Sequence, residues 1–414
     1  MYTLYKNMSE KNNAVYIKEV TITDYKCFKG ENKFSFYDEN DNWCQWTVFL
    51  GNNNTGKTNL LKAISSMEPI IDPSNKFSMK NLYIHYIKDF FKYEIVITTA
   101  NEFDTLLLRH TGHNIWFTKP SIKKWCENLK IYGYGVVREV EDKGISNNDS
   151  TKDSLLDGTK LINFESWLFQ LDYSVKNATT NYSIKEANRR LNIIKEIITS
   201  EIFPEIDDIR FITDENLKNY LEFKTQNGWF NFSALGYGYQ STLSWMVDFC
   251  KKMFDRYPDS ENPLKEPAVV LIDEIDLHLH PQWQRNIIKY LSNIFTKTQF
   301  IVTTHSPFVI QSMEKVNLYT LHHYENCTRV KHWQNQSFIG WRIEEILSEV
   351  MDLKENINTD AYQQLMNDFD KALDSNNLKA AQKAYTQLAK ILHPLSEERK
   401  LLEIQLSQIV PDND

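Results

Sequence analysis

Hydrophobic positions near the start of the chain follow strand spacing and then helix spacing. The runs VYIKEVTITDYKCF, NKFSFYD and CQWTVFLG are rich in β-branched and aromatic residues and are separated by polar residues, which predicts consecutive strands. After them, Leu60, Leu61, Ile64 and Met67 recur at helical spacing. We therefore expect a strand that leads into a helix across the short segment GNNNTGK.

The middle of the chain mixes strands with a helical insertion. The runs YEIVIT, DTLLLRH and LKIYGYGVVR predict strands, and the polar segment EDKGISNNDSTKDS predicts an exposed loop. Residues at about 159–203 carry two helical periodicities separated by a polar turn, which predicts a short helical hairpin. Further strands, IRFI and LEFKTQNGWFNF, precede a glycine-rich turn that opens a long helix.

Two buried strands and a helical tail complete the pattern. The strand PAVVLI ends at Asp273, and the strand QFIVTT ends just before His305. Beyond Trp341 almost every segment has helical periodicity. The pattern predicts an α/β domain over residues 1–321, and a C-terminal, mainly helical interaction region over residues 322–414.

Composition indicates the cellular compartment of the protein and limits the classes of partner that it can bind. The net charge of −8 argues against a uniformly basic nucleic-acid coat, but it leaves a local basic groove for DNA open. The five cysteines are scattered without C-x-x-C pairs, which indicates a reducing compartment. The N-terminus lacks the apolar core of a signal peptide, and no apolar run reaches about 18 residues. We expect a cytoplasmic protein with no membrane partner.

The segment between the third strand and the first helix carries a phosphate-binding pattern. It fits G-x-x-x-x-G-K-[ST], in which backbone N–H groups surround phosphate oxygens and the lysine neutralises them. The N-terminus of the following helix adds its positive dipole end. The residues expected to hold the nucleotide are Gly51, Asn52, Asn53, Asn54, Thr55, Gly56, Lys57, Thr58 and Asn59.

Two acids follow the strand PAVVLI. A carboxylate at the end of a buried strand suits Mg²⁺ beside phosphates, so Asp273 and the Thr58 hydroxyl are the candidate metal ligands. Glu274 is the candidate general base that activates water. The alternative is an ordinary strand end with two solvated acids.

His305 follows the strand QFIVTT. Ligands gather at the carboxyl ends of parallel strands, so His305 is expected near Lys57 and Asp273 as a catalytic contact to the γ-phosphate. A histidine in this position can also be purely structural.

These motifs resemble those of ABC-like ATPases of the SMC, RecF and OLD type. The resemblance implies an ATPase head with a mixed sheet around the phosphate-binding core, an antiparallel N-terminal sheet and a helical lobe. It also implies that two copies dimerise head-to-tail around ATP and Mg²⁺. The family signature L-S-x-G-x-[QE] then completes the nucleotide site of the second subunit.

The segment LGYGYQ lies where this signature is expected. The resemblance assigns Leu235, Gly236, Gly238 and Gln240 to the nucleotide of the partner subunit, and Asp276 to the loop that crosses the dimer interface. Gly236 replaces the usual serine, which implies a weaker clamp on the γ-phosphate.

The resemblance also narrows the function. The tail has helices where OLD nucleases have the strands of a Toprim domain, and no HNH arrangement is found, so we expect no nuclease centre in this chain. An OLD-like ATPase with a helical tail resembles the ATPase subunit of Septu-type anti-phage systems, in which a separate HNH nuclease performs the cleavage. The alternatives are a RecF- or OLD-like DNA repair ATPase, and an ATP-gated scaffold with little turnover.

Other polar residues have no clear assignment. Arg138 follows a strand and is a candidate for the phosphate site. His278 and His280 are interpreted as surface or interface residues, because no metal-ligand spacing surrounds them. The glutamine loop of the family could not be placed, since Gln170 lies on an expected helix.

Overall fold

The computed structural model divides the chain into two compact units, Met1–Ile346 and Leu347–Asp414. It describes residues 15–66, 68–71, 77–79, 92–99, 105–111, 114–117, 129–141, 154–353 and 359–408. The polar segment 142–153, which was expected to be an exposed loop, lies outside these residues. Among the described helices, none has both the length and the apolar run that a membrane span needs.

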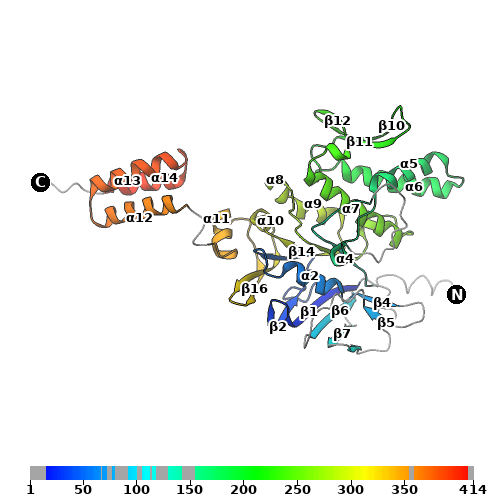
Figure 1. Cartoon of the computed structure of the whole chain (residues 1–414), viewed down its shortest axis with the longest axis horizontal. Coiled ribbons are helices and arrows are strands. Elements are labelled where there is room, and N and C mark those ends of the chain that lie inside the picture. Colours follow the sequence, from blue (N-terminus) through cyan, green and yellow to red (C-terminus); the bar gives the residue numbers. More distant parts are fainter. Residues whose placement is uncertain are drawn as a thin grey trace. The chain divides into compact units, whose positions relative to one another are not determined.

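A six-stranded sheet forms the centre of the first unit, in the order β16-β15-β3-β14-β13-β9. Its strands β14 and β16 are labelled in Figure 1. Its strands are β3 (Trp46–Gly51), β9 (Ile131–Tyr134), β13 (Ala268–Ile272), β14 (Thr298–Thr304), β15 (Val316–Tyr324) and β16 (Cys327–Gln336). All neighbouring pairs are parallel except β15 with β16. The carboxyl ends of β3, β13 and β14 therefore meet at one edge of the sheet.

An antiparallel sheet covers one face of the central sheet. Its order is β2-β1-β6-β7-β8, from β1 (Val15–Tyr25), β2 (Phe28–Ser35), β6 (Lys92–Thr99), β7 (Thr105–Thr111) and β8 (Asn114–Phe117). The Phe34 ring of β2 lies edge-on to Phe49 of β3 at 5.5 Å and to Tyr319 of β15 at 5.3 Å, measured between ring centroids. All three side chains are buried, so the two sheets share one hydrophobic core. A separate pair joins β4 (Pro69–Ile71) and β5 (Phe77–Met79).

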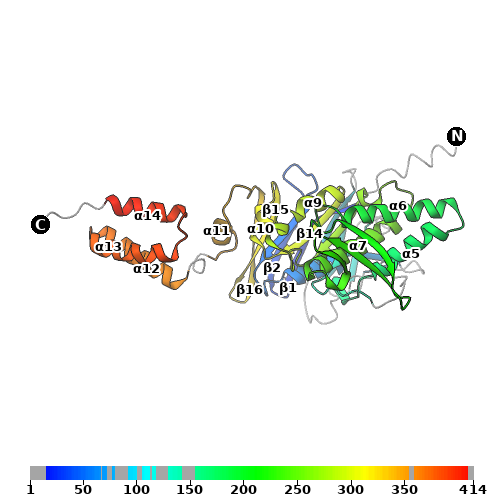
Figure 2. The same ribbon diagram turned by 90° about the horizontal axis from the view of Figure 1, so that it is seen from above.

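A lobe of helices and short strands lies between β9 and β13 in the sequence. It contains α4 (Ser154–Asp157), α5 (Phe164–Asn177), α6 (Asn181–Ile198), β10 (Asp208–Thr213), β11 (Asn219–Thr225), β12 (Gly228–Asn231) and α7 (Tyr237–Arg256). Helices α5 and α6 lie side by side in both views and occupy the range of the expected hairpin (Figure 2). Their first turns are capped by Asn163 and Thr180, whose side chains accept from Ser166 N and Ser183 N.

Shorter helices follow the strands of the central sheet. They are α2 (Lys57–Ser66), α8 (Pro281–Gln284), α9 (Ile287–Ile294), α10 (Pro307–Gln311) and α11 (Ile343–Glu345). Helix α2 begins directly after the loop that ends β3, as the spacing of Leu60, Leu61 and Ile64 predicts. The prediction of an α/β fold with a mixed sheet, an antiparallel N-terminal sheet and a helical lobe is confirmed.

The end of the first unit differs from the expected boundary at residue 321. That residue lies inside β15, and the hairpin of β15 and β16 extends the sheet to Gln336. Residues 317–321 are all buried, because β15 lies inside the sheet between β3 and β16, so this strand lacks the polar–apolar alternation that marks a half-buried strand in a sequence. Residues 322–336 are thus strand and turn, and the compact unit continues to Ile346.

The second unit is helical, as expected for the tail. After a π-helical turn at Ile346–Val350, it contains α12 (Asp360–Asp374), α13 (Leu378–Ile391) and α14 (Glu397–Gln408). Its core is built from Phe369, Ala372, Ala381, Ala384, Leu388 and Leu402. Since this core is small, single truncations within it should be costly.

Replacing Leu388 with alanine should loosen the C-terminal unit. Leu388 has no exposed surface, and a Leu→Ala change in a core costs about 2–5 kcal/mol. The matched control is Leu401→Ala in α14, because Leu401 is 60% exposed. We expect faster hydrogen exchange of α12–α14 amides in Leu388→Ala than in the control. Equal exchange in the two variants would contradict this core.

Candidate functional site

The loop between β3 and α2 requires its glycines. Gly56 has a φ of +93°, and a Cβ atom there would overlap Cys27 Sγ and lie 2.9 Å from the Phe28 ring. A Cβ at Gly51 would lie 2.6 Å from Leu321 O. The Thr328 hydroxyl of β16 donates to Thr55 O at 3.0 Å, which holds the loop against the sheet.

Part of the loop and of the first turn of α2 faces outward. Asn52, Asn53, Asn54 and Thr58 are exposed, so backbone N–H groups of this stretch can reach a ligand. Asn59 is tied to the β1–β2 turn, because its Oδ1 accepts from Lys26 Nζ at 2.6 Å.

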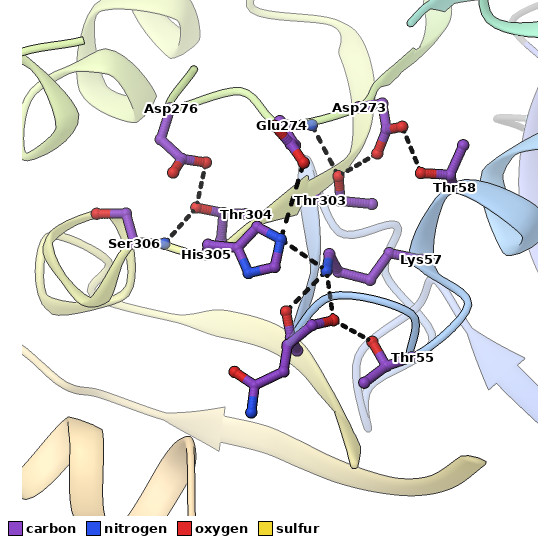
Figure 3. Close-up of polar contacts among 12 residues, drawn as sticks. Thr55, Lys57, Thr58, Asp273, Glu274, Asp276, Thr303, Thr304, His305 and Ser306 are labelled. Atoms are coloured by element: carbon purple, nitrogen blue, oxygen red, sulfur yellow. Dashed lines mark hydrogen bonds and ion pairs between the residues drawn. The ribbon is translucent and has the colours of Figure 1, made fainter. Parts of the chain in front are cut away.

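Lys57 is buried at the centre of the site (Figure 3). Its ammonium group donates to Gly51 O at 2.7 Å and to Asn52 O at 2.9 Å, and it contacts His305 Nε2 at 2.9 Å. Burial lowers the pKa of Lys57, while Asp273, Glu274 and Asp276 oppose this shift. The lysine is therefore held by weak neutral acceptors that a phosphate can replace.

Asp273 joins three segments of the chain. It is 1% exposed, and its carboxylate accepts from Thr58 Oγ1 and from Thr303 Oγ1, each at 2.6 Å. Its backbone N–H donates to Tyr134 O in β9 at 2.8 Å. The carboxylate and the Thr58 hydroxyl are oxygen donors that suit Mg²⁺, which takes few protein ligands and keeps several waters. This donor set fits the metal that the sequence predicts.

Glu274 lies beside Lys57 with a strained backbone. Its φ is +50°, a conformation that costs a non-glycine residue about 1–3 kcal/mol. The backbone N–H donates to Thr303 Oγ1 at 2.8 Å, and carboxylate Oε1 lies 3.8 Å from His305 Nε2. The side chain is partly exposed, so it can reach a water molecule at the sheet edge.

His305 is held in its neutral form. Burial and then the nearby Lys57 charge lower the pKa of His305, although Glu274, Asp276 and Asp273 oppose the shift. Since the Lys57 ammonium is a donor, Nε2 accepts from it and the ring proton is assigned to Nδ1.

A row of hydroxyl groups at the end of β14 supports the acids. Thr304 Oγ1 donates to Asp276 Oδ1 at 2.6 Å and accepts from Ser306 N at 2.9 Å. Thr303 Oγ1 likewise donates to Asp273 Oδ1 and accepts from Glu274 N. These hydroxyls were not among the predicted site residues. The sequence feature that points to them is the run TTHS at the strand end, where small hydroxyl side chains flank the histidine.

Arg138 contacts the backbone of the acidic strand end. Its Nη2 donates to Asp273 O and Glu274 O, both at 2.9 Å, and its Nη1 donates to Ser241 Oγ at 2.9 Å. Desolvation lowers the pKa of Arg138 to about 10, so the guanidinium stays charged at neutral pH. The arginine thus reaches the site through carbonyl groups.

The signature segment, Leu235–Gln240, packs against the loop that follows Glu274 and bonds within itself. Gly236 caps α7 without a side chain, and the position of its missing Cβ has nothing within 4 Å. At Gly238 a Cβ would lie 2.5 Å from His278 O, so the first turn of α7 rests on the loop after Glu274. Gln240 Nε2 donates to Leu235 O at 2.6 Å.

His280 and Gln170, which had no functional role in the sequence analysis, lie outside the cluster around Lys57. His280 caps α8, where its Nδ1 accepts from Gln282 N at 3.4 Å. In the part of the chain that is described, no cluster of three His, Cys, Asp or Glu side chains could hold a metal ion. Gln170 lies on α5, in a groove against β10 and β11.

Comparisons with known proteins show what the chain is similar to. Residues 139–311 match the family described as "AAA domain, putative AbiEii toxin, Type IV TA system". The chain is 31% identical over 264 residues to the Septu protein PtuA of Bacillus thuringiensis, covering 62% of this chain and 64% of that protein. It is 30% identical over 182 residues to the Retron Ec83 probable ATPase of Escherichia coli, covering 44% and 33%. The matches thus span less than two thirds of either relative.

Among solved structures, an Smc head bound to the C-winged helix domain of ScpA aligns with a TM-score of 0.49 at 14% identity, covering 77% of this chain and 98% of that one. The phosphate-binding loop, the acidic strand end and the family match make this chain similar to ABC-like ATPases. Within this class, the chain resembles the Septu protein PtuA and the retron ATPases.

The pKa of His305 should report the charges around it. Lys57→Met removes the charge that lowers this pKa and leaves three carboxylates that raise it, so the pKa should rise. Glu274→Gln removes a carboxylate, so the pKa should fall. Histidine NMR titrations would measure both shifts, with His305→Asn to assign the signal. Shifts of the same sign would contradict the geometry.

The same pKa shift affects stability. Because the folded state lowers the pKa of His305 below 6.5, the unfolded state binds more protons just below that pH. This contribution to the free energy of unfolding is therefore present above pH about 6.5 and lost as the pH falls toward the folded pKa.

Proposed function

We propose that this chain binds ATP with Mg²⁺ and hydrolyses the bond between its β- and γ-phosphates. The observation that supports this most directly is the convergence of Lys57, Asp273, Glu274 and His305 at one sheet edge, linked by the contacts in Figure 3. The loop amides and Lys57 hold the phosphates. Thr58 and Asp273 hold Mg²⁺, which neutralises phosphate charge when bound.

Hydrolysis requires a rearrangement of Lys57. The ammonium leaves Gly51 O and Asn52 O for the phosphate oxygens, which are stronger acceptors because they are charged. His305 then loses its lysine contact and turns to the γ-phosphate. Glu274, next to His305, accepts a proton from the attacking water.

The signature segment acts on a second copy of the chain. Leu235, Gly236, Gly238, Gln240 and Asp276 complete the partner's nucleotide site in a head-to-tail dimer. Gly236 and Tyr237 at the start of α7 are exposed and the helix has no side-chain cap, which supports this proposal because free helix N–H groups suit a phosphate. Gly236 offers no hydroxyl, so the clamp is weak and turnover is slow.

The biological role is regulation of a nuclease in anti-phage defence. The relatives named for Septu and retron systems support it. The resemblance to the ATPase subunit of Septu-type systems implies a separate HNH nuclease. We propose such a nuclease as the partner, acting with this ATPase in the cytoplasm. The proposal includes no nuclease centre in this chain, and it keeps DNA as a further ligand.

A scaffold with little turnover is the second candidate. Gly236 at the serine position favours it, since the γ-phosphate clamp then relies on backbone groups alone. In this case ATP binding gates the partner and hydrolysis only resets it. A DNA repair ATPase of the RecF or OLD type would use the same site.

ATP binding and turnover should separate in two variants. Lys57→Ala should abolish binding, because the central phosphate contact is lost. Glu274→Gln should keep binding and reduce kcat by about 100-fold or more, as expected for loss of a general base. Calorimetry and phosphate release would measure these effects. Unchanged ATP affinity in Lys57→Ala would refute the nucleotide site, and unchanged turnover in Glu274→Gln would favour the scaffold.

Restoring the signature serine should strengthen the dimer. Since the Cβ position of Gly236 is open and its φ is −59°, Gly236→Ser fits without strain. In the Glu274→Gln background with ATP, light scattering should show a doubled mass at lower protein concentration for Gly236→Ser than for Gly236→Ala. Equal dimerisation of the two would argue against this role of the segment.

A further inference from the structure

Arg138 lies where β9, the acidic strand end and α7 meet. Four hydrogen bonds leave its guanidinium: two to the carbonyls of Asp273 and Glu274, one to Ser241 Oγ, and one from Nε to Gly135 O at 3.2 Å. The planar fork of an arginine can reach several acceptors at once, which a lysine cannot. The side chain therefore connects elements that are distant in sequence.

Helix α7 is fastened along one face. Ser241 and Asp248 are seven residues apart, two helical turns, so both point to the same side. Asp248 Oδ2 accepts from the Tyr134 hydroxyl at 2.8 Å, and Oδ1 accepts from Ile162 N at 3.2 Å. These buried bonds anchor the middle of α7 to β9. Ser241 is the attachment nearer to the signature turn.

The first turn of α7 also touches the loop after Glu274. Gly238 approaches His278 O so closely that no side chain fits between them. The amino end of α7 thus has two connections to residues 273–278, one through Arg138 and one direct. We therefore expect a displacement of this helix end to shift the backbone of residues 273–278, which includes Glu274.

The backbone at Glu274 is sensitive to such a displacement. Its left-handed φ persists only because neighbouring groups hold it. Arg138 binds the carbonyl on each side of this strained residue, while Thr303 binds its N–H group. A small rotation at this point swings the carboxylate relative to the attacking water.

We propose that Arg138 is a positioning residue that couples the signature turn of α7 to the general base Glu274 within one subunit. Whatever docks on the amino end of α7 sets the angle of Glu274 through Ser241 and Arg138. This inference rests on the proposed ATPase function, and it adds to it the route by which the signature regulates turnover.

Variants at both ends of the link test it. Ser241→Ala removes only the α7 bond and should lower kcat by about fivefold, the value of one hydrogen bond. Arg138→Lys keeps the charge but cannot bridge the acceptors, and it should lower kcat by about 10- to 100-fold. The affinity for ATP, measured by calorimetry, should stay within twofold in both. The double variant should be no slower than Arg138→Lys alone.

The matched control is Ser244→Ala. Ser244 lies one turn further along α7, and its hydroxyl donates to Gln240 O within the helix, away from Arg138. A structural role alone would make Ser244→Ala as slow as Ser241→Ala, and would make the effects of Ser241→Ala and Arg138→Lys multiply. Either result would overturn the coupling.

Hydrogen exchange separates this inference from the proposed function. In Ser241→Ala and Arg138→Lys, the amides of residues 273–279 should exchange faster than in the wild type and in Ser244→Ala. This holds even if the wild type does not hydrolyse ATP, an outcome that would refute only the ATPase function. Unchanged exchange in both variants would refute the link itself.

Discussion

The carboxylate of Asp273 is the interaction on which the site depends. It accepts from Thr58 at the start of α2 and from Thr303 near the end of β14, while its own backbone is paired with β9. A buried carboxylate without such donors would be costly to ionise. The two hydroxyls therefore stabilise the charge and fix the phosphate loop, the acidic strand and the histidine strand in one arrangement.

Charge balance explains why the loop is ordered around its lysine. Lys57 lies among Asp273, Glu274 and Asp276, which offset the cost of burying its ammonium group. Its direct contacts are neutral, since they are two carbonyls and a neutral imidazole. Burial, and then this same positive charge, lower the pKa of His305. The acids thus allow a buried cation that remains available to a stronger anionic acceptor.

Much of this arrangement is predictable from local pattern. The spacing after Lys57 gives α2, and the apolar run before Asp273 gives β13, so both motifs could be placed on their elements. The roles of the site residues remain predictions. The sequence places Arg138 and the run TTHS at the ends of strands, but the contacts of Arg138 and Thr303 with Asp273 depend on β9 and β14 flanking β13. Such pairings join segments far apart in sequence.

The hairpin of β15 and β16 shows a second limit. Its turn, Glu325–Asn326, lacks the glycine that marks tight hairpins, although Glu325 adopts a φ of +50°. Without that signal, the division of the chain at residue 321 cut through a strand. The predicted boundary also separated Thr328 of β16 from the ATPase domain, although its hydroxyl donates to Thr55 O in the loop between β3 and α2.

The contact between Gly56 and Cys27 has a consequence for how such sequences can diverge. The left-handed glycine leaves no room for a Cβ beside the Cys27 sulfur, and the sulfur lies 3.7 Å from Thr55 O. A bulkier residue at position 27 would press on the backbone of the loop between β3 and α2. Positions 27 and 56 therefore form one steric unit, and related chains should show them covarying despite their separation in sequence.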